Sequence, residues 1–214
     1  MITETTFRIA FLILFLMLIT MRAYFMVKVR RSGGRIMPDE EAIKREGGRG
    51  VFIFRVIMFF ALMAFLVMYI LGAKWIDAFR FQLPVWLRWF GFALGILSVA
   101  FMTWTQVTLD TQWSAQLQLS KDHHLVTAGP YARVRHPLYS SVFGWGLSLA
   151  LLIANWIFVA VTLLSIAGLL WRIPKEEQMM LEAFGEEYKI YMGHTGRFFP
   201  RLATLKDKKG ALHA

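Results

Sequence analysis

Long apolar runs constrain this chain more than any other feature of its sequence. The runs Phe7–Val27, Val51–Leu71 and Leu83–Val107 are each long enough to cross a bilayer, since a membrane-spanning helix needs about 20 mainly apolar residues. A fourth run, Tyr139–Ile173, is long enough for two crossings joined by a tight turn at Asn155. The sequence therefore predicts an all-α integral membrane protein with five membrane-spanning helices, the last two of which form a hairpin.

The composition agrees with this prediction. Apolar residues make up 57% of the 214 residues, whereas soluble domains contain about 45–50%. Cysteine is absent, which excludes disulfides, thiolate metal sites and a cysteine nucleophile. Arg22, Arg55 and Arg88 lie near the ends of the apolar runs, where we expect their side chains to reach the lipid headgroups. The motif Gly91-x-x-x-Gly95 predicts a close helix contact.

The distribution of positive charge predicts the orientation in the membrane. The formal net charge is +10, and Lys and Arg cluster in residues 28–50, 121–135 and 172–209. The opposite side carries fewer basic residues: Arg8, Lys74, Arg80 and Arg88. By the positive-inside rule, the N-terminus is expected outside and the C-terminus in the cytoplasm. The charge is then a topology signal that also attracts anionic headgroups, and no nucleic-acid partner is expected.

The organisation of the chain follows its apolar runs. Residues 1–108 are expected to hold the first three membrane-spanning helices, with a basic cytoplasmic loop at 28–50. Residues 109–201 form a second unit, made of a polar loop, the helix hairpin and a C-terminal cap. Residues 202–214 are expected to be a disordered tail.

Polar sequence is concentrated in two places, and the first is the stretch from Gln116 to Tyr139. Pro137 suits the start of the following helix, whose free N–H groups can receive an anionic group such as a carboxylate. Alternatively, Arg135 and His136 simply anchor that helix at the headgroup level. Three of the five histidines lie in this stretch, but their spacing matches no established ligand pattern, so no metal site is expected.

The second polar stretch begins with Arg172. Glu176 lies four residues later, on the same helical face if the helix continues across Pro174. Such a pair is often a surface ion pair worth a few tenths of a kcal/mol. In a pocket, it could instead hold a carboxylate through the arginine and an ammonium through the glutamate. The spacing alone does not choose between these alternatives. We expect a new helix to start at Pro174 and to end at Gly185.

Together, the two polar stretches closely resemble the isoprenylcysteine carboxyl methyltransferase family of membrane methyltransferases. The motif Q-x6-H-x-L-V-T-x-G-x-Y-x-x-x-R-H-P-x-Y is matched from Gln116 to Tyr139. The motif R-x-x-x-E-E-x-x-L-x-x-x-F-G-x-x-Y-x-x-Y is matched from Arg172 to Tyr191, with a loose register at the aliphatic position. The motifs occur in the family order, with a hydrophobic hairpin between them, and the resemblance extends to Arg201.

The resemblance implies S-adenosyl-L-methionine as cofactor and a lipid or lipidated molecule as methyl acceptor. The cofactor pocket is expected on the cytoplasmic side, formed by the loop before the fourth helix and the C-terminal helical segment. The implied cofactor-binding residues are Gln116, His123, His124, Leu125, Val126, Tyr131, His136, Pro137, Leu138, Tyr139 and Glu176. Arg172 would bind the acceptor, and Arg172 and Glu177 are the candidate catalytic residues. Eukaryotic members have Ser at the position of Leu138, whereas the ending Thr195–Pro200 looks like that of short prokaryotic members.

A carboxylate is the acceptor that this reading favours, because it is ionised at neutral pH and needs no general base. Arg172 could orient it by a two-point contact that lysine cannot reproduce. Three alternatives remain open at this point. The acceptor could be a phospholipid amine, with Glu177 or Glu176 as base. The chain could be a nicotinamide-dependent membrane reductase, or a membrane module without catalytic activity.

Overall fold

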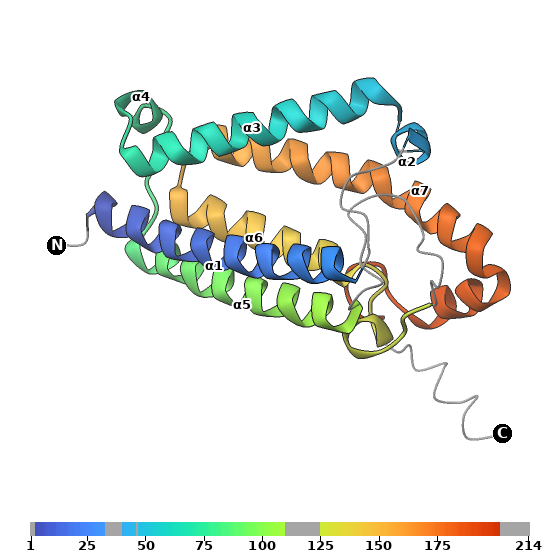
Figure 1. Cartoon of the computed structure of the whole chain (residues 1–214). Coiled ribbons are helices and arrows are strands. Elements are labelled where there is room, and N and C mark those ends of the chain that lie inside the picture. Colours follow the sequence, from blue (N-terminus) through green and yellow to red (C-terminus); the bar gives the residue numbers. More distant parts are fainter. Residues whose placement is uncertain (1–2, 33–39, 46, 110–124, 202–214) are drawn as a thin grey trace, which may run out of the picture.

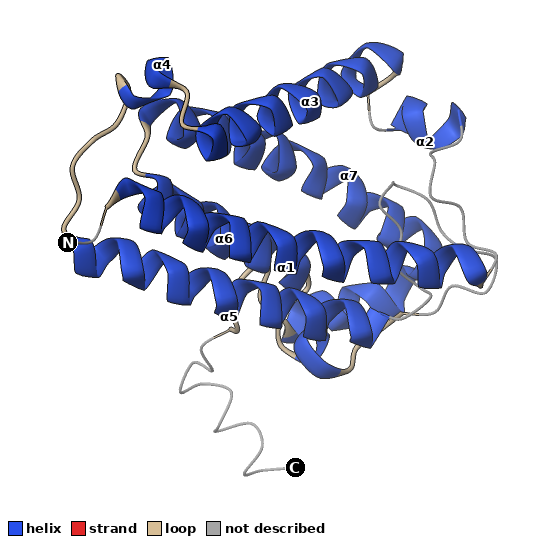
Figure 2. Cartoon of the chain, turned by 60° about the vertical axis from the view of Figure 1, so that its left-hand side comes forward, coloured by secondary structure: helices blue, strands red, loops and turns tan. Residues whose placement is uncertain are grey.

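The computed structural model describes residues 3–32, 40–45, 47–109 and 125–201, and its regular elements within these ranges are helices (Figures 1 and 2). In chain order they are α1 (Glu4–Arg31), α2 (Glu40–Arg45), α3 (Arg49–Leu71), α4 (Lys74–Asp77), α5 (Val85–Leu109), η2 (Gly129–Ala132), α6 (Pro137–Ile153) and α7 (Trp156–His194). The predicted all-α fold is confirmed for these residues. The predicted boundaries between the units of the chain, after residues 108 and 201, stay predictions. Residues 202–214 lie outside the described ranges.

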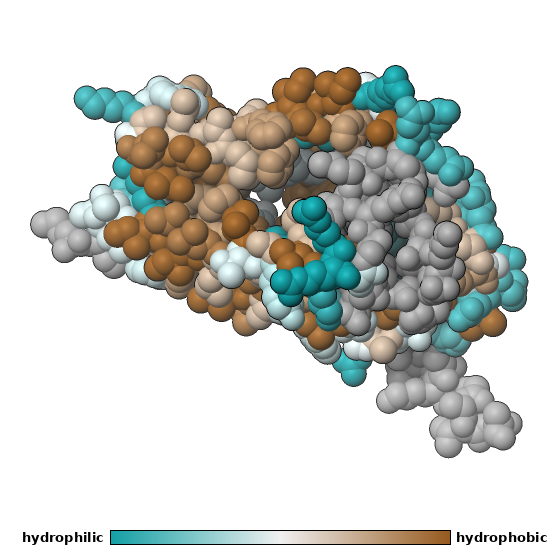
Figure 3. Space-filling model, in the orientation of Figure 1, coloured by the Kyte–Doolittle hydropathy of each residue, from teal (hydrophilic) through white to brown (hydrophobic). Residues whose placement is uncertain are grey.

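Among the described residues, four helices are long and apolar enough to cross a membrane: α1, α3, α5 and α7. Helix α6 has 17 residues, which makes it about 25 Å long against a hydrocarbon core of about 30 Å. Apolar side chains cover much of the outer surface over α1, α3 and α5, and the surface is hollowed between α3 and α1 (Figure 3). The integral membrane character is confirmed, whereas a fifth crossing by α6 stays a prediction.

Helices α5 and α6 form the closest pair in the bundle, because small residues line their contact. The Ser148 hydroxyl on α6 donates to the Gly91 carbonyl on α5, at 2.7 Å. A Cβ atom at Gly95 would lie 2.6 Å from that same hydroxyl, and one at Gly144 would lie 2.7 Å from the Ser98 hydroxyl. The predicted contact at Gly91 and Gly95 is thus confirmed, and it places the end of α5 beside the start of α6.

Arg88 is buried rather than extended to the headgroups, so that prediction was wrong. Its guanidinium donates to Glu4 at 2.8 and 3.1 Å and to the Leu152 carbonyl at the end of α6 at 2.7 and 3.0 Å. Tyr69 on α3 donates to the same Glu4 carboxylate at 3.1 Å. An acidic partner within reach makes burial of the arginine possible. The cluster joins α1, α3, α5 and α6 at one end of the bundle.

The turn between α6 and α7 is confirmed at the predicted place. Ala154 takes a left-handed conformation (φ 51°), and the Asn155 side chain accepts hydrogen bonds from the N–H groups of Ile157 and Phe158. Its amide nitrogen also donates to the Ile76 carbonyl at 2.8 Å, which fixes the turn against α4.

Helix α7 continues without a break through Pro174, so the prediction of a new helix at this residue was wrong. A proline removes one backbone hydrogen bond, which a long helix in a membrane protein tolerates. The helix does bend at Gly185, whose φ of 52° and ψ of −120° are non-helical. Beyond this bend, the last turns of α7 fold back toward η2 (Figure 1). The two predicted polar stretches therefore meet at the same end of the bundle.

Candidate functional site

The start of α6 and the middle of α7 bring together four of the predicted site residues. The Tyr139 hydroxyl donates to the Glu176 carboxylate at 2.6 Å. One residue further along α7, the Glu177 carboxylate lies 3.1 Å from Nε2 of His136. His136 is the N-cap of α6 and Pro137 its first residue, which fixes where this helix starts. The two polar stretches thus meet through side-chain contacts.

Glu177 is the most heavily bonded carboxylate of this site. Its side chain is 7% exposed and accepts hydrogen bonds from Arg135 Nε at 3.2 Å, from Arg197 Nε at 3.2 Å and from Arg197 Nη2 at 2.5 Å, besides its contact with His136. Burial by itself would raise the pKa of Glu177, but the hydrogen bonds from His136 and Arg197 outweigh burial and lower the pKa to about 2. Glu177 is therefore ionised at any physiological pH.

Arg135 joins this cluster to the end of α7. Its Nη1 donates to the carbonyls of Met192 and Thr195, at 3.1 and 2.5 Å. The last carbonyls of a helix have no partner within the helix, and a cation there is favourable. One guanidinium thus satisfies the end of α7 and binds Glu177 in its middle, which holds the bend at Gly185 between two fixed points.

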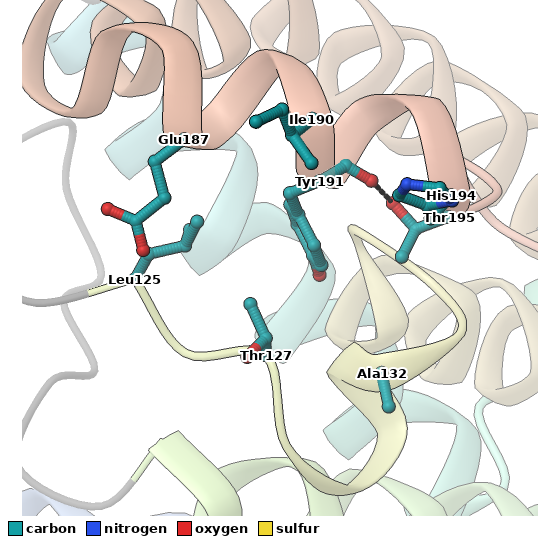
Figure 4. A pocket seen from close by; sticks show the side chains of 8 residues that line it. All are labelled: Leu125, Thr127, Ala132, Glu187, Ile190, Tyr191, His194 and Thr195. Atoms are coloured by element: carbon teal, nitrogen blue, oxygen red, sulfur yellow. Dashed lines mark hydrogen bonds between the residues drawn. The ribbon is translucent and has the colours of Figure 1, made fainter.

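The described part of the loop before α6, residues 125–136, packs against the last turns of α7. The Tyr191 hydroxyl donates to the Tyr131 carbonyl in η2 at 2.7 Å. Between these elements lies a pocket of about 280 Å³. Figure 4 shows Leu125, Thr127 and Ala132 on the loop side and Glu187, Ile190, Tyr191, His194 and Thr195 on the α7 side. The pocket is mainly apolar, with the Glu187 carboxylate near Leu125.

The structure describes most of the predicted site residues. Leu125 lines the pocket, whereas Val126, Tyr131 and Leu138 are half-buried nearby in the chain. Arg172 is half-buried in α7, one helical turn before Glu176. Gln116, His123 and His124 lie outside the described residues. Within the described ranges, no group of three or more His, Cys, Asp or Glu side chains could hold a metal ion.

Arg197 was not among the predicted site residues. It lies beyond α7 and contacts a glutamate 20 positions earlier in the chain. A single arginine in a basic C-terminal region carries no sequence signal for such a contact. The only available hint was the likeness of the ending Thr195–Pro200 to that of short prokaryotic proteins.

Comparison with known proteins shows which family the segment that carries these residues resembles. Residues 91–182 match the profile of the isoprenylcysteine carboxyl methyltransferase family. This segment contains His136, Tyr139, Arg172, Glu176 and Glu177. Residues 91–182 of the chain are similar to the isoprenylcysteine carboxyl methyltransferase family. The resemblance predicted from the two motifs is thereby confirmed.

Several known proteins are similar to part of the chain. The chain is 43% identical over 77 residues to a protein-S-isoprenylcysteine O-methyltransferase from Schizosaccharomyces pombe, covering 34% of this chain and 31% of that protein. It is 33% identical over 118 residues to the protein of the same name from Tribolium castaneum, covering 54% and 42%. The nickel-cobalt-cadmium resistance protein NccN from Alcaligenes xylosoxydans xylosoxydans is 30% identical over 115 residues, covering 53% and 54%.

The chain thus spans about a third to a half of the length of these relatives. A solved structure of the eukaryotic intramembrane Ras methyltransferase of the family aligns with a TM-score of 0.47 and 27% identity. The alignment covers 68% of this chain and 48% of that one.

Proposed function

We propose that this protein is an S-adenosylmethionine-dependent membrane methyltransferase that acts on the carboxylate of a lipid-associated acceptor, such as a prenylated cysteine. The observation that carries the proposal is the contact of the two family motifs. Tyr139 and His136 from the first motif bond to Glu176 and Glu177 from the second, in a chain with helices long enough to cross a membrane.

The described residues fit a cofactor that carries a positive charge in one part and a flat nucleobase in another. S-adenosylmethionine supplies a methyl group on a positively charged sulfur. Glu176 offers a carboxylate for positive charge, and Tyr139 holds this carboxylate by its hydroxyl. The mainly apolar pocket beside Leu125 offers space for a flat ring. Gln116, His123, His124, Val126, Tyr131, His136, Pro137 and Leu138 complete the proposed cofactor site.

Arg172 is the proposed acceptor-binding and catalytic residue. It lies in α7 one turn nearer the apolar part of that helix than Glu176 does, so it stands between the bilayer and the proposed cofactor site. A guanidinium can bind a carboxylate through two parallel hydrogen bonds. Such a contact would orient the acceptor oxygen, and orientation is the main requirement for an in-line displacement.

The state of Glu177 favours a carboxylate acceptor over an amine. An amine must lose a proton before it attacks, and an effective base has a pKa near the working pH. Glu177, with a pKa of about 2 and three cationic or imidazole partners, is a weak base. A carboxylate acceptor is already ionised and requires no such base.

The proposed orientation places this site in the cytoplasm. The end of α1, helix α2, the turn η2 and the end of α7 lie at one end of the bundle (Figure 1). The positive-inside rule assigns that end to the cytoplasmic side, with the N-terminus outside. A polar cofactor would then enter from the cytoplasm, whereas a lipid tail would enter from the membrane.

Methyl transfer in lipid vesicles tests this proposal. Vesicles holding the protein receive S-adenosylmethionine with a radiolabelled methyl group, and either N-acetyl-S-farnesylcysteine or phosphatidylethanolamine as acceptor. We expect transfer to the farnesylcysteine carboxylate, released as methanol by mild base. Arg172→Lys is expected to lower turnover by about 100-fold while cofactor affinity changes little. Transfer to phosphatidylethanolamine alone would replace this proposal with amine methylation, and no transfer to either acceptor would contradict it.

A further inference from the structure

The residues that follow α7 form a short clasp on the loop before α6. This clasp, residues Thr195–Phe198, runs beside Arg133–His136 and is held by backbone hydrogen bonds. The N–H of Arg135 donates to the Gly196 carbonyl at 2.8 Å, the N–H of His136 to the Arg197 carbonyl at 3.0 Å and the N–H of Gly196 to the Arg133 carbonyl at 3.1 Å. The Ser140 hydroxyl in the first turn of α6 adds a bond to the Phe198 carbonyl at 2.7 Å.

The clasp brings a charged side chain to Glu177. Arg197 bonds both oxygens of this carboxylate, through Nη2 at 2.5 Å and through Nε at 3.2 Å. The Glu177 side chain is 7% exposed and that of Arg197 is 47% exposed. Arg197 thus covers the solvent side of a carboxylate whose other side faces Arg135 and His136.

Glu177 in turn determines the state of His136. An ionised carboxylate only accepts hydrogen bonds, so Nε2 of His136 carries the proton in the 3.1 Å contact. The partner of one ring nitrogen fixes the tautomer and the orientation of a histidine. The ring also has two aromatic neighbours, with centroid distances of 5.5 Å to Tyr139 and 6.2 Å to Phe198.

The same contacts fix the position of Glu176. Glu176 and Glu177 are adjacent in α7, so anchoring Glu177 against the start of α6 sets the height at which Glu176 meets Tyr139. The 2.6 Å bond between Tyr139 and Glu176 therefore depends on the anchor beside it.

We propose that Arg197 and Glu177 are a positioning pair, which holds His136 and Glu176 in the geometry that the cofactor requires without touching the cofactor. The inference rests on the proposed function for its ligand. It gives Glu177 a role different from that of a base, and it makes the clasp a part of the cofactor site.

The first test measures the affinity for S-adenosylhomocysteine by calorimetry on the full chain in detergent. Arg197→Ala is expected to weaken binding by about tenfold. Arg197→Lys keeps the positive charge but can make only one of the two contacts, so it is expected to weaken binding by less than about tenfold. Glu177→Gln combined with Arg197→Ala should cost less than the sum of the two single changes in free energy, because both remove one interaction. The matched control is Lys189→Ala, which breaks an exposed ion pair with Glu186 in the same helix and should leave affinity unchanged.

Wild-type affinity in Arg197→Ala would overturn the proposal, and so would an equal loss in the Lys189→Ala control. If a variant has a lower unfolding temperature, the comparison is made well below that temperature. A loss of affinity that disappears there would show a purely structural role and would also overturn the proposal.

The second test needs no cofactor, so it separates failure of this inference from failure of the proposed function. Nitrogen NMR on histidine-labelled protein reports which ring nitrogen carries the proton, and the signal of His136 is assigned with His136→Asn. We expect a proton on Nε2 in the wild type and a mixed tautomer in Glu177→Gln and in Arg197→Ala. An unchanged tautomer in both variants would overturn the positioning pair, even if the wild type bound no S-adenosylhomocysteine.

Discussion

Glu177 and Arg88 are buried charges at opposite ends of the bundle, and each is matched by several partners. Glu177 accepts from two arginines and contacts a histidine, whereas Arg88 donates to one glutamate and to a backbone carbonyl. Removing one partner of a buried pair leaves the other charge uncompensated, which costs more than the pair itself contributes. A single substitution of either residue should therefore strongly lower the stability of the protein, although only Glu177 belongs to the proposed site.

The low pKa of Glu177 predicts how stability depends on pH. Because the pKa falls from its usual 4.5 to about 2 in the folded protein, its stabilising effect is present above about pH 4.5 and is lost as the pH falls toward 2. Glu177→Gln should lower the free energy of unfolding by on the order of 3 kcal/mol at pH 7. Unfolding measured in detergent at pH 7, 4 and 3 should show this difference shrinking toward low pH.

The exposed Glu186 provides the control for this prediction. It pairs with Lys189 on the surface, with 73% of its side chain exposed, and Glu186→Gln should change stability by less than about 1 kcal/mol at every pH. A difference between wild type and Glu177→Gln that stays constant from pH 7 to pH 3 would contradict the assigned ionisation.

The Arg88 cluster predicts non-additive effects on stability. Arg88→Met should destabilise the protein by about 3–5 kcal/mol, because it leaves the half-buried Glu4 without its main partner. Adding Glu4→Gln should restore part of that loss, which thermal unfolding of the two single variants and the double variant would measure. Arg49→Ala, which breaks an exposed pair with Glu40, should cost about 0–1 kcal/mol. Fully additive losses would show that Glu4 and Arg88 do not interact.

At the scale of elements, the course of α7 determines where the two motifs meet. The first part of α7 is apolar and makes the helix long enough to cross a membrane, and the polar part that begins at Arg172 also carries Glu176 and Glu177. The bend at Gly185 then returns the chain to the loop before α6, where Tyr191 bonds to Tyr131. Without the bend, the last turns would continue away from that loop.

Gly185→Ala should disturb this bend. A φ of 52° with a ψ of −120° is accessible to glycine and strained for other residues, so the change should cost about 1–3 kcal/mol of stability. It should also weaken S-adenosylhomocysteine binding measured by calorimetry. Gly168→Ala in the regular part of α7, where a Cβ meets no atom within 4 Å, should be neutral or slightly stabilising. Equal effects of the two changes would contradict a special role for Gly185.

At the scale of the whole molecule, the sequence predicted the helices and the two motifs but not how charged groups pair. Apolar runs report helices directly, and this is why the turn at Asn155 was predicted correctly. The prediction of a new helix at Pro174 was wrong because a local rule about proline ignores the support that a long helix receives from its neighbours. Arg88 and Arg197 were missed because each bonds to a residue distant in sequence, Glu4 and Glu177, and no local pattern encodes such a pair.

The most direct test of the account is calorimetric titration of S-adenosylhomocysteine into the detergent-purified full chain. The central claim is that the two motifs, joined through Tyr139 and Glu176, form a cofactor site. It predicts binding in the micromolar range, weakened by at least about tenfold in Glu176→Gln. No binding by a protein whose circular dichroism shows the helical fold intact would contradict the claim, and so would equal affinity in the wild type and Glu176→Gln.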